Sequence, residues 1–413
     1  MASTLIDVTA ARERFPALKR THDGRPVVFA DAPGGTQVPE SVIEAMSAYL
    51  RTSNSNTHGV FPTSVETDAL IADARTAAAE FLGSDPDEIV FGQNATTLLF
   101  SISRAIGRDL GPDDELVVTR LDHDANVAPW LALAEDTGAT IRHVDFSVED
   151  GTFDLESLDA ALSDRTRIVA FTLASNALGT VTPAEEIVRR ARHTSAIIVA
   201  DGVHVAQHRA LDVRALDVDL LACSPYKFFG PHLGVVFGRR ELLRDLRPYK
   251  VRPSRDTVPE RWETGTLPHE SLAGLIAAVD YLGPLSESSS DRRSAVLTAM
   301  EAIREHESEL SRRFLEGIRD LNGVRLYGIA DPGRVAERTP TFAIRVGDQL
   351  PEQSATRLAE RGIYVWDGDY YALEVMERLG LQSSGGAVRI GFCHYNTSEE
   401  VDRVLEALRE VSS

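Results

Sequence analysis

A lysine and an aspartate stand after two apolar runs, and this pairing indicates a particular chemistry. The run at 196–200 ends at Asp201, and the run at 220–223 leads into a turn that holds Lys227. The two residues are 227 − 201 = 26 positions apart, enough chain to bring both to one edge of a sheet. A lone loop lysine is more often simply solvated, whereas a desolvated lysine amine can form a Schiff base. Chemistry with pyridoxal 5'-phosphate (PLP) also requires an acid facing the pyridine nitrogen, and Asp201 supplies one.

The middle of the chain alternates short β-branched runs with amphipathic stretches. We predict strands at 88–91, 115–119, 140–145, 167–173, 196–200, 220–223 and 234–238. Helical patterns lie between several of them, at 96–106, 126–135, 155–162 and 184–191. This alternation predicts an α/β fold with a mainly parallel, seven-stranded sheet covered on both faces. Ligands bind at the carboxyl ends of such strands, where Asp201 and Lys227 stand.

A change in composition marks a second unit. Residues 283–293 carry three consecutive serines with a Gly and a Pro, which is typical of a linker. A long helix is expected next, followed by strands near 324–327, 341–346, 363–366 and 388–392 with helices near 352–361, 372–379 and 398–411. We therefore predict three parts: an N-terminal arm (1–25) packing on the small domain, a large domain (26–284) and a smaller C-terminal α/β domain (285–413).

The composition of the chain limits the kinds of partner and compartment that it suits. The chain has 413 residues and a net charge of −20, which argues against nucleic acid and against anionic lipid surfaces. No apolar run approaches the length of a membrane span, and the N-terminus lacks the pattern of a secretory signal. The two cysteines, Cys223 and Cys393, are too few for a disulfide framework or a cysteine-rich zinc site. A reducing, cytoplasmic compartment is the expectation.

From about Phe29 to the C-terminal helix, several separated motifs occur in the order found in one family. The chain resembles the class V, fold-type I PLP enzymes, within the cysteine desulfurase-like branch. The resemblance implies that Lys227 forms the aldimine with PLP and that Asp201 is the partner of the pyridinium nitrogen. His204 matches a position usually held by Gln that faces the phenolic oxygen of the cofactor, and an imidazole can also make that hydrogen bond.

The resemblance also implies which residues contact the phosphate group of the cofactor. The turn after the strand at 88–91 implies contacts from Ala95, Thr96 and Thr97, where the start of a helix favours an anion. Plain capping of the helix by threonine is the alternative. Ser224 and Tyr226 would add contacts beside Lys227. Thr266 matches a residue that reaches the phosphate from the other subunit, which implies a homodimer with composite sites.

Further matches concern the ring of the cofactor and the substrate. His123 matches the residue that stacks on the pyridine ring, and Asn176 matches a hydrogen-bond partner of the phenolic oxygen. Arg389, between the apolar Val388 and Ile390, matches the arginine that holds the substrate α-carboxylate, which suits the fork geometry of a guanidinium. His58 matches a loop that faces the substrate.

One loop departs from the family pattern. Aligning Gly368 places Tyr371 where desulfurases carry a nucleophilic cysteine, and Trp366 where they carry a second arginine. A tyrosine cannot accept sulfur as a persulfide. Cys223 is expected to be a packing residue, and nothing in the sequence brings Cys393, four residues past Arg389, to the site.

We therefore expect a PLP enzyme that acts on an amino acid through a Lys227 aldimine and a quinonoid, with Lys227 as the base. Cysteine desulfurase-like C–S lyase chemistry (β-elimination) without a protein persulfide is favoured, and a class V aminotransferase or an amino-acid epimerase is the alternative. Trp366 and Tyr371 predict an aromatic substrate pocket and a bulky or sulfur-bearing side chain.

Two motifs also fit enzymes of other classes. His204 and His208 are four residues apart and suit a zinc hydrolase if helical, but only Asp201 is an evident third ligand, so no metal is expected. Ser224 and Lys227 also fit the Ser/Lys pair of penicillin-binding hydrolases, but the accompanying Ser-Asp-Asn and Lys-Thr-Gly motifs do not occur.

Overall fold

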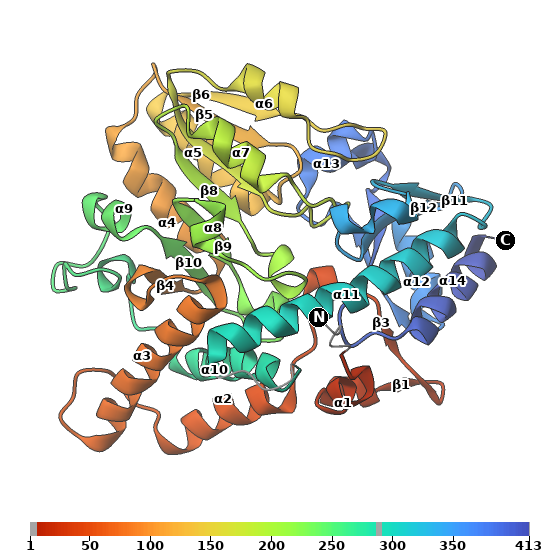
Figure 1. Ribbon diagram of the computed structural model, residues 1–413, viewed down its shortest axis with the longest axis horizontal. Helices are drawn as coiled ribbons and strands as arrows, with labels where there is room; N and C mark the ends of the chain where they lie inside the picture. Colours follow the sequence, from red (N-terminus) through yellow and green to blue (C-terminus); the bar gives the residue numbers. More distant parts are fainter. Residues whose placement is uncertain (1–5, 286–290, 413) are drawn as a thin grey trace.

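A seven-stranded sheet forms the centre of the larger part of the molecule. The computed structural model describes residues 6–285 and 291–412 (Figure 1). The strand order is β4-β10-β9-β8-β7-β5-β6; β10 runs antiparallel to both neighbours and the other adjacent pairs are parallel. The strands are β4 Ile89–Gly92, β5 Glu115–Thr119, β6 Thr140–Val144, β7 Thr166–Thr172, β8 Ile197–Asp201, β9 Leu220–Cys223 and β10 Gly234–Gly238. The predicted fold class is thus confirmed, and each predicted strand end lies within one residue of the observed one.

Alternation along these strands explains why both faces of the sheet are covered. Val169 and Ile198 belong to one buried cluster, whereas their chain neighbours Ile168 and Val199 belong to another. Successive strand residues point to opposite faces, so a run that is apolar throughout must be buried on both sides. The covering helices are α3 Pro62–Leu82, α7 Ala184–Ala191 and α10 His269–Leu282 on the first face, and α4 Ala95–Ile106 and α5 Ala128–Thr137 on the second.

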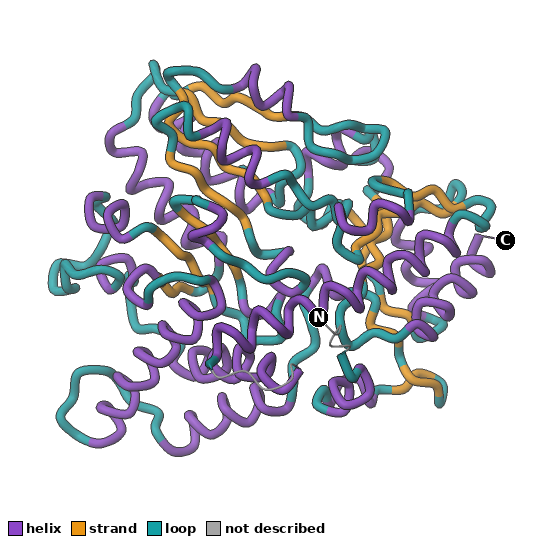
Figure 2. Tube along the Cα trace, viewed as in Figure 1, coloured by secondary structure: helices purple, strands orange, loops and turns teal. Residues whose placement is uncertain are grey.

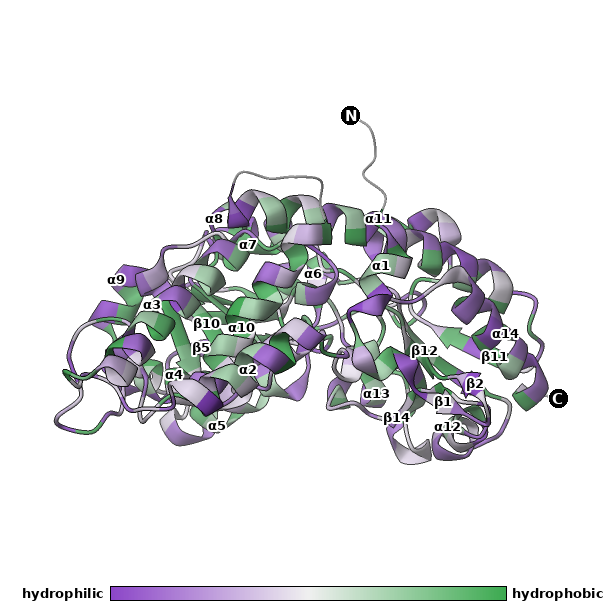
Figure 3. Cartoon of the chain, turned by 90° about the horizontal axis from the view of Figure 1, so that it is seen from below, coloured by the Kyte–Doolittle hydropathy of each residue, from purple (hydrophilic) through white to green (hydrophobic). Residues whose placement is uncertain are grey.

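The remaining helices of this part complete the connections. They are α2 Glu40–Thr52, which lies against α10, and the shorter α6 Leu155–Ala161, α8 Val213–Leu216 and α9 Arg240–Asp245. Coloured by hydropathy, the strands of the sheet are green while the outer helix faces carry the hydrophilic residues (Figure 3). Among the described residues, no helix is long and apolar enough to cross a membrane.

A second, antiparallel sheet of four strands lies in the C-terminal part of the chain (Figure 2). Its order is β11-β12-β15-β14, formed by β11 Val324–Tyr327, β12 Thr341–Val346, β15 Ala387–Gly391 and β14 Trp366–Gly368. It accompanies α11 Arg292–Ile318, α12 Pro351–Ala359, α13 Leu373–Arg378 and α14 Ser398–Ser412. Phe314 of α11, Phe342 of β12 and Leu408 of α14 share its core.

The predicted strand at 363–366 is wrong as a single element. Residues Ile363–Tyr364 form β13, which pairs in parallel with β3 Val28–Phe29, and the chain then turns so that Trp366 begins β14 beside β15. The predicted linker at 283–293 is also shorter than expected. Asp291 caps α11, which begins at Arg292, and residues 286–290 lie outside the described residues.

The N-terminal segment contacts both parts of the molecule. Within α1 Val8–Glu13, Arg12 forms an ion pair of 2.8 Å with Glu400 of α14. Phe15 packs edge-on against Tyr281 of α10, with ring centroids 5.3 Å apart. The hairpin β1 Thr21–His22 and β2 Arg25–Pro26 follows, and Arg403 donates to the carbonyl of Pro26. The domain boundaries at 25 and 284 stay predictions.

Candidate active site

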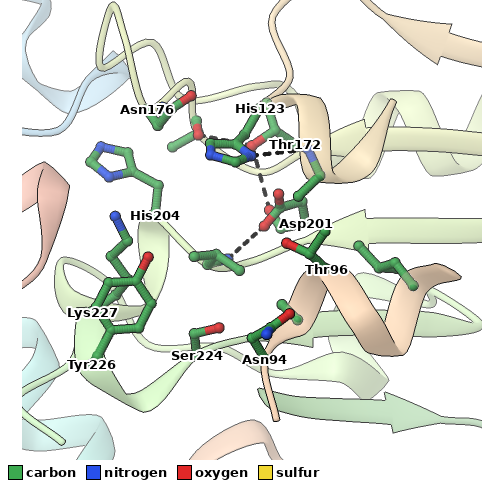
Figure 4. A pocket seen from close by; sticks show the side chains of 15 residues that line it. Asn94, Thr96, His123, Thr172, Asn176, Asp201, His204, Ser224, Tyr226 and Lys227 are labelled. Carbon is green, nitrogen blue, oxygen red and sulfur yellow. Dashed lines mark hydrogen bonds between the residues drawn. The ribbon is translucent and has the colours of Figure 1, made fainter. Parts of the chain in front are cut away.

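A pocket lies where β8 and β9 end and α4 begins, at the sheet edge expected to bind ligands (Figure 4). Nine of the residues singled out in the sequence line it: Ala95, Thr96, His123, Asn176, Asp201, His204, Ser224, Tyr226 and Lys227. The other lining residues, which sequence reasoning did not single out, are Asn94, Leu99, Ala125, Thr172, Ala174 and Val203. Motifs spread over more than a hundred positions of the sequence thus converge on one cavity.

Lys227 enters the pocket from the short turn after β9. Its side chain is buried, Nζ donates to the carbonyl of Pro33, and the ammonium lies 4.9 Å from the ring centre of Tyr226. Burial, helped by the charge of Arg389, lowers the pKa of Lys227 to about 7, although the charge of Asp201 opposes the shift. A large fraction of the amine is therefore neutral and nucleophilic near neutral pH.

Asp201 ends β8 and is fully enclosed. Its Oδ1 accepts a hydrogen bond of 2.8 Å from the N–H of Val203. Burial raises the pKa of Asp201 to about 6, while that hydrogen bond and the charge of Lys227 act in the opposite direction. A positively charged group beside the carboxylate would favour its ionised form, which is what a protonated pyridine ring offers.

A second buried carboxylate, Asp122, supports the turn that carries His123. It accepts hydrogen bonds from Asn126 Nδ2 at 2.7 Å, from the N–H of Thr172 at 3.0 Å and from the hydroxyl of Thr119. Burial raises the pKa of Asp122 well above its usual range, and the charge of Asp201 adds to the rise. Asp122 was not among the predicted site residues, although a charged residue between an apolar strand and His123 is a visible signal in the sequence.

The first turn of α4 forms one end of the pocket, and the start of a helix favours an anion. Asn94 caps the helix, because its Oδ1 accepts a hydrogen bond of 2.8 Å from the N–H of Thr97. Ala95 and Thr96 line the pocket, whereas Thr97 does not and instead takes part in the cap. A Cβ on Gly234 would lie 2.4 Å from the carbonyl carbon of Asn94, so only glycine allows β10 to approach this turn so closely.

His123 lies on the pocket as a neutral ring. Its Nδ1 accepts a hydrogen bond of 3.0 Å from the N–H of Ala125, which places the ring proton on Nε2. Burial and the charges of Lys227 and Arg389 lower the pKa of His123 to about 4. The ring also stacks on Tyr371, with centroids 5.5 Å apart and an angle of 24° between the planes. A flat, neutral imidazole suits stacking on a second aromatic ring.

Two buried polar atoms of pocket residues have no hydrogen-bond partner among the described residues. They are Oδ1 of Asn176, whose Nδ2 donates to the carbonyl of Tyr370, and Nδ1 of His204. Unpaired buried polar atoms are costly, so both suit a polar ligand that would complete their hydrogen bonds. Together with the amine, the carboxylate and the helix start, these donors and acceptors fit PLP.

Arg389 lies in β15. It does not line the pocket itself but contacts Asn176, which does. Its Nη1 donates to the carbonyl of Asn176 at 3.0 Å, and its guanidinium lies 4.4 Å from the ring centre of Tyr370. Burial lowers the pKa of Arg389 to about 10, so it stays a cation at neutral pH. Its Nε has no partner among the described residues, which leaves donor capacity for a carboxylate.

Besides Thr97 and Arg389, four predicted site residues do not line this pocket. His58 and Thr266 line a different, open hollow on the surface. Trp366 is the first residue of β14 and Tyr371 lies in the loop after it, with half or more of each side chain exposed. Trp366 packs on Gly34, and Tyr371 covers His123.

The histidine pair considered for zinc has other partners. His208 Nδ1 lies 2.7 Å from Oε2 of Glu307, and His204 Nε2 contacts the hydroxyls of Thr339 and Thr341. Within residues 6–285 and 291–412, no group of three His, Cys, Asp or Glu side chains is arranged to hold a metal ion. The geometry gives the zinc hydrolase alternative no support.

Both cysteines lie in the interior. Cys223, in β9, and Cys393, just after β15, are almost completely buried and do not line the pocket. Burial raises the pKa of each thiol. Neither is therefore an exposed, reactive thiolate.

Comparison with known proteins identifies the family of this chain. Residues 28–404 match the family described as aminotransferase class-V, and the chain belongs to that family. A probable cysteine desulfurase of Streptomyces coelicolor is 34% identical over 98% of this chain and 97% of its own. The apo structure of a cysteine desulfurase from Thermococcus onnurineus NA1 superposes with a TM-score of 0.88 at 27% identity, covering 100% and 99% of the two chains.

A more distant structure shares the fold with a TM-score of 0.79 at 21% identity, over 97% of this chain and 99% of that one. It is described as a C-DES mutant with glycine covalently linked to the PLP cofactor. The protein is therefore a PLP-dependent enzyme of the cysteine desulfurase-like branch, as the sequence predicted.

Proposed function

We propose that this enzyme breaks the C–S bond of a sulfur-bearing amino acid and releases the sulfur without transferring it to a cysteine of its own chain. The proposal rests on one observation: among the described residues, no cysteine that could accept sulfur lies at the pocket. Tyr371 stands over His123 at the pocket, and both cysteines of the chain are buried elsewhere. The similarity to cysteine desulfurases supports the C–S chemistry itself.

Different pocket residues would contact different parts of the cofactor. Lys227 would hold PLP covalently, Asp201 would face the ring nitrogen, and His123 would cover the ring. Ala95, Thr96, Ser224 and Tyr226 would surround the phosphate. Asn176 and His204 would face the phenolic oxygen, where Oδ1 of Asn176 can only accept a hydrogen bond and Nδ1 of His204 can accept or donate one. When bound, PLP supplies an electron sink that stabilises negative charge at the α-carbon of an amino acid.

Lys227 then serves as the base for the α-proton. With a pKa of about 7, its released amine is partly neutral at neutral pH and can accept a proton at Nζ. Arg389, a buried cation with unused donor capacity, would hold the α-carboxylate and so fix which substituents of the α-carbon face Lys227.

The side chain of the substrate would leave past the aromatic wall formed by His123 and Tyr371. As the C–S bond breaks, the sulfur departs with the bonding electron pair and takes up one proton, so it leaves as sulfide or a thiol. A phenol oxygen cannot form the S–S bond of a persulfide, and nothing in this wall retains the sulfur.

The test is to supply the PLP-loaded enzyme with cysteine and with S-substituted cysteines, and to measure sulfide or thiol against pyruvate. We expect equal amounts of the two products without an added reductant or sulfur acceptor. Formation of a 2-oxo acid that retains the sulfur would instead identify an aminotransferase. Exchange of the α-proton with deuterium, without release of sulfur, would identify an epimerase; either result would contradict the proposal.

A further inference from the structure

A buried histidine–glutamate pair lies directly behind the pocket residue His204. His204 and His208 flank one short turn after β8, and their rings meet edge-on with centroids 5.2 Å apart. His208 Nδ1 lies 2.7 Å from Oε2 of Glu307, which comes from the middle of α11. His208 and Glu307 are both almost completely buried, so the pair is not a solvated surface contact.

The second oxygen of Glu307 offers a connection to His204. Oε1 of Glu307 has no hydrogen-bond partner among the described residues, and Glu307 and Thr339 line one small cavity of about 10 Å³. A space of this size, with Arg209, Arg304 and Ser311 among its other lining residues, can hold one water molecule. The hydroxyl of Thr339 in turn lies 3.2 Å from Nε2 of His204.

His204 thus has two distinct ends. Its Nε2 meets the hydroxyls of Thr339 and, at 3.1 Å, of Thr341, while its Nδ1 is unpaired and the side chain lines the pocket near Lys227 (Figure 4). An imidazole can take up a proton at one nitrogen and release one from the other, which an amide at this position cannot do at neutral pH.

The charges around this arrangement come from several elements. Lys227, Arg389 and His208 face His204, and burial together with their charges lowers the pKa of His204 well below its usual range. The groups that surround the pair are Arg209, Arg304 and Arg338 on the cavity side, and Cys393 and His394 behind it. Since His204 faces mostly cations, a nearby anion such as Glu307 is what would favour its protonation.

We propose that Glu307 is a positioning residue that exchanges a proton with His204 through the small cavity and the hydroxyl of Thr339. The proton on Nε2 of His204 passes by way of the hydroxyl of Thr339 and water to the carboxylate oxygen Oε1 of Glu307, and Nδ1 of His204 takes up the proton of an oxygen in the pocket. The reverse transfer restores both groups, so no oxidant or other reactant is consumed. The inference depends on PLP as cofactor but not on which product the enzyme releases.

The experiment follows the visible absorption of the PLP-loaded enzyme as a function of pH, in the wild type and in Glu307→Gln. Gln keeps the shape and a hydrogen bond to His208 but loses the negative charge. We expect the midpoint of the spectral transition to move to lower pH by about one unit, a tenfold change in proton affinity. In a His204→Gln background the same Glu307→Gln change should leave the midpoint where it is.

Two matched controls separate a relay from a structural effect. Glu400→Gln removes another buried carboxylate, the partner of Arg12, and should not move the midpoint. If Glu307→Gln fails to fold, as judged by circular dichroism, the pair Thr339→Val and Thr339→Ser decides: Val should move the midpoint and Ser should restore it. An unmoved midpoint in a folded Glu307→Gln enzyme, or an equal shift with and without His204, would overturn the inference.

Discussion

At the scale of single residues, burial shifts the pKa of each ionisable group in the pocket toward its uncharged form. Lys227 is held partly neutral, Asp201 partly protonated and His123 neutral, and in each case burial is the largest cause. Such opposed shifts within one cavity are typical of active sites. A ligand with a cationic ring would favour the ionised form of Asp201, and an aldehyde would react with the neutral amine of Lys227.

The low pKa of Lys227 predicts how fast the apo protein takes up PLP at different pH values. Only the neutral amine attacks an aldehyde, and the neutral fraction falls about tenfold for each pH unit below the pKa. Because the pKa of Lys227 is lowered to about 7, the uptake rate should rise with pH up to about 7 and then level off. Stopped-flow absorption of the apo protein mixed with excess PLP measures it.

Lys227→Ala is the control, and it should show no covalent uptake at any pH. A rate that keeps rising to about pH 10, as for an ordinary lysine, would show that the amine is not desolvated in the way the structure indicates.

At the scale of elements, regular patterns were predictable and contacts between distant segments were not. The strands around Asp201 and Cys223 follow from apolar runs, and the start of α4 could also have been placed from Asn94, a residue type that favours helix caps. The break between β13 and β14 depends on β3 pairing with one half of an apolar run, which periodicity cannot show. Similarly, Glu307 meets His208 across 99 positions of the sequence, and no local signal indicates that contact.

The loop after β14 is a second case in which the sequence does not indicate the contacts of its residues. Tyr370 and Tyr371 both adopt left-handed backbone conformations, with φ of 57° and 56°, which are uncommon for aromatic residues. The hydroxyl of Tyr370 donates to the carbonyl of Ala387, and the N–H of Asp124 donates to the carbonyl of Tyr371 at 2.7 Å. The alignment of Gly368 identified the departure from the family pattern, but only these contacts place Tyr371 over His123.

At the scale of the whole molecule, one region suggests a second copy of the chain. Thr266 and His58 line a surface hollow away from Lys227, so one chain does not bring them to its own pocket. The adjoining segment exposes large apolar side chains, at Leu50, Val60, Phe61 and Val65. Exposed apolar groups close together in a chain with a net charge of −20 favour an interface between proteins. We propose a homodimer in which Thr266 completes the phosphate site of the other subunit.

The dimer proposal predicts both a mass and a pattern of complementation. Each chain is 45.1 kDa, so sedimentation should give about twice that value. Thr266→Ala should weaken PLP binding by about tenfold or more, as expected for loss of a hydrogen bond to a charged group. Dimers that combine one Lys227→Ala subunit with one Thr266→Ala subunit should regain activity from the one intact site. A monomeric enzyme, or mixed dimers with no regained activity, would contradict the composite site.

The most direct test of the central claim removes both sulfur atoms that a persulfide would need. We predict that the Cys223→Ala/Cys393→Ala enzyme, loaded with PLP, releases sulfide or thiol with kcat/KM close to that of the wild type, because both thiols are buried away from the pocket. Single replacements and thermal unfolding show whether any loss comes from packing instead. A fall in kcat/KM by about three orders of magnitude in a folded variant, as removal of a nucleophile produces, together with a persulfide detected by mass spectrometry on a wild-type cysteine, would contradict the account.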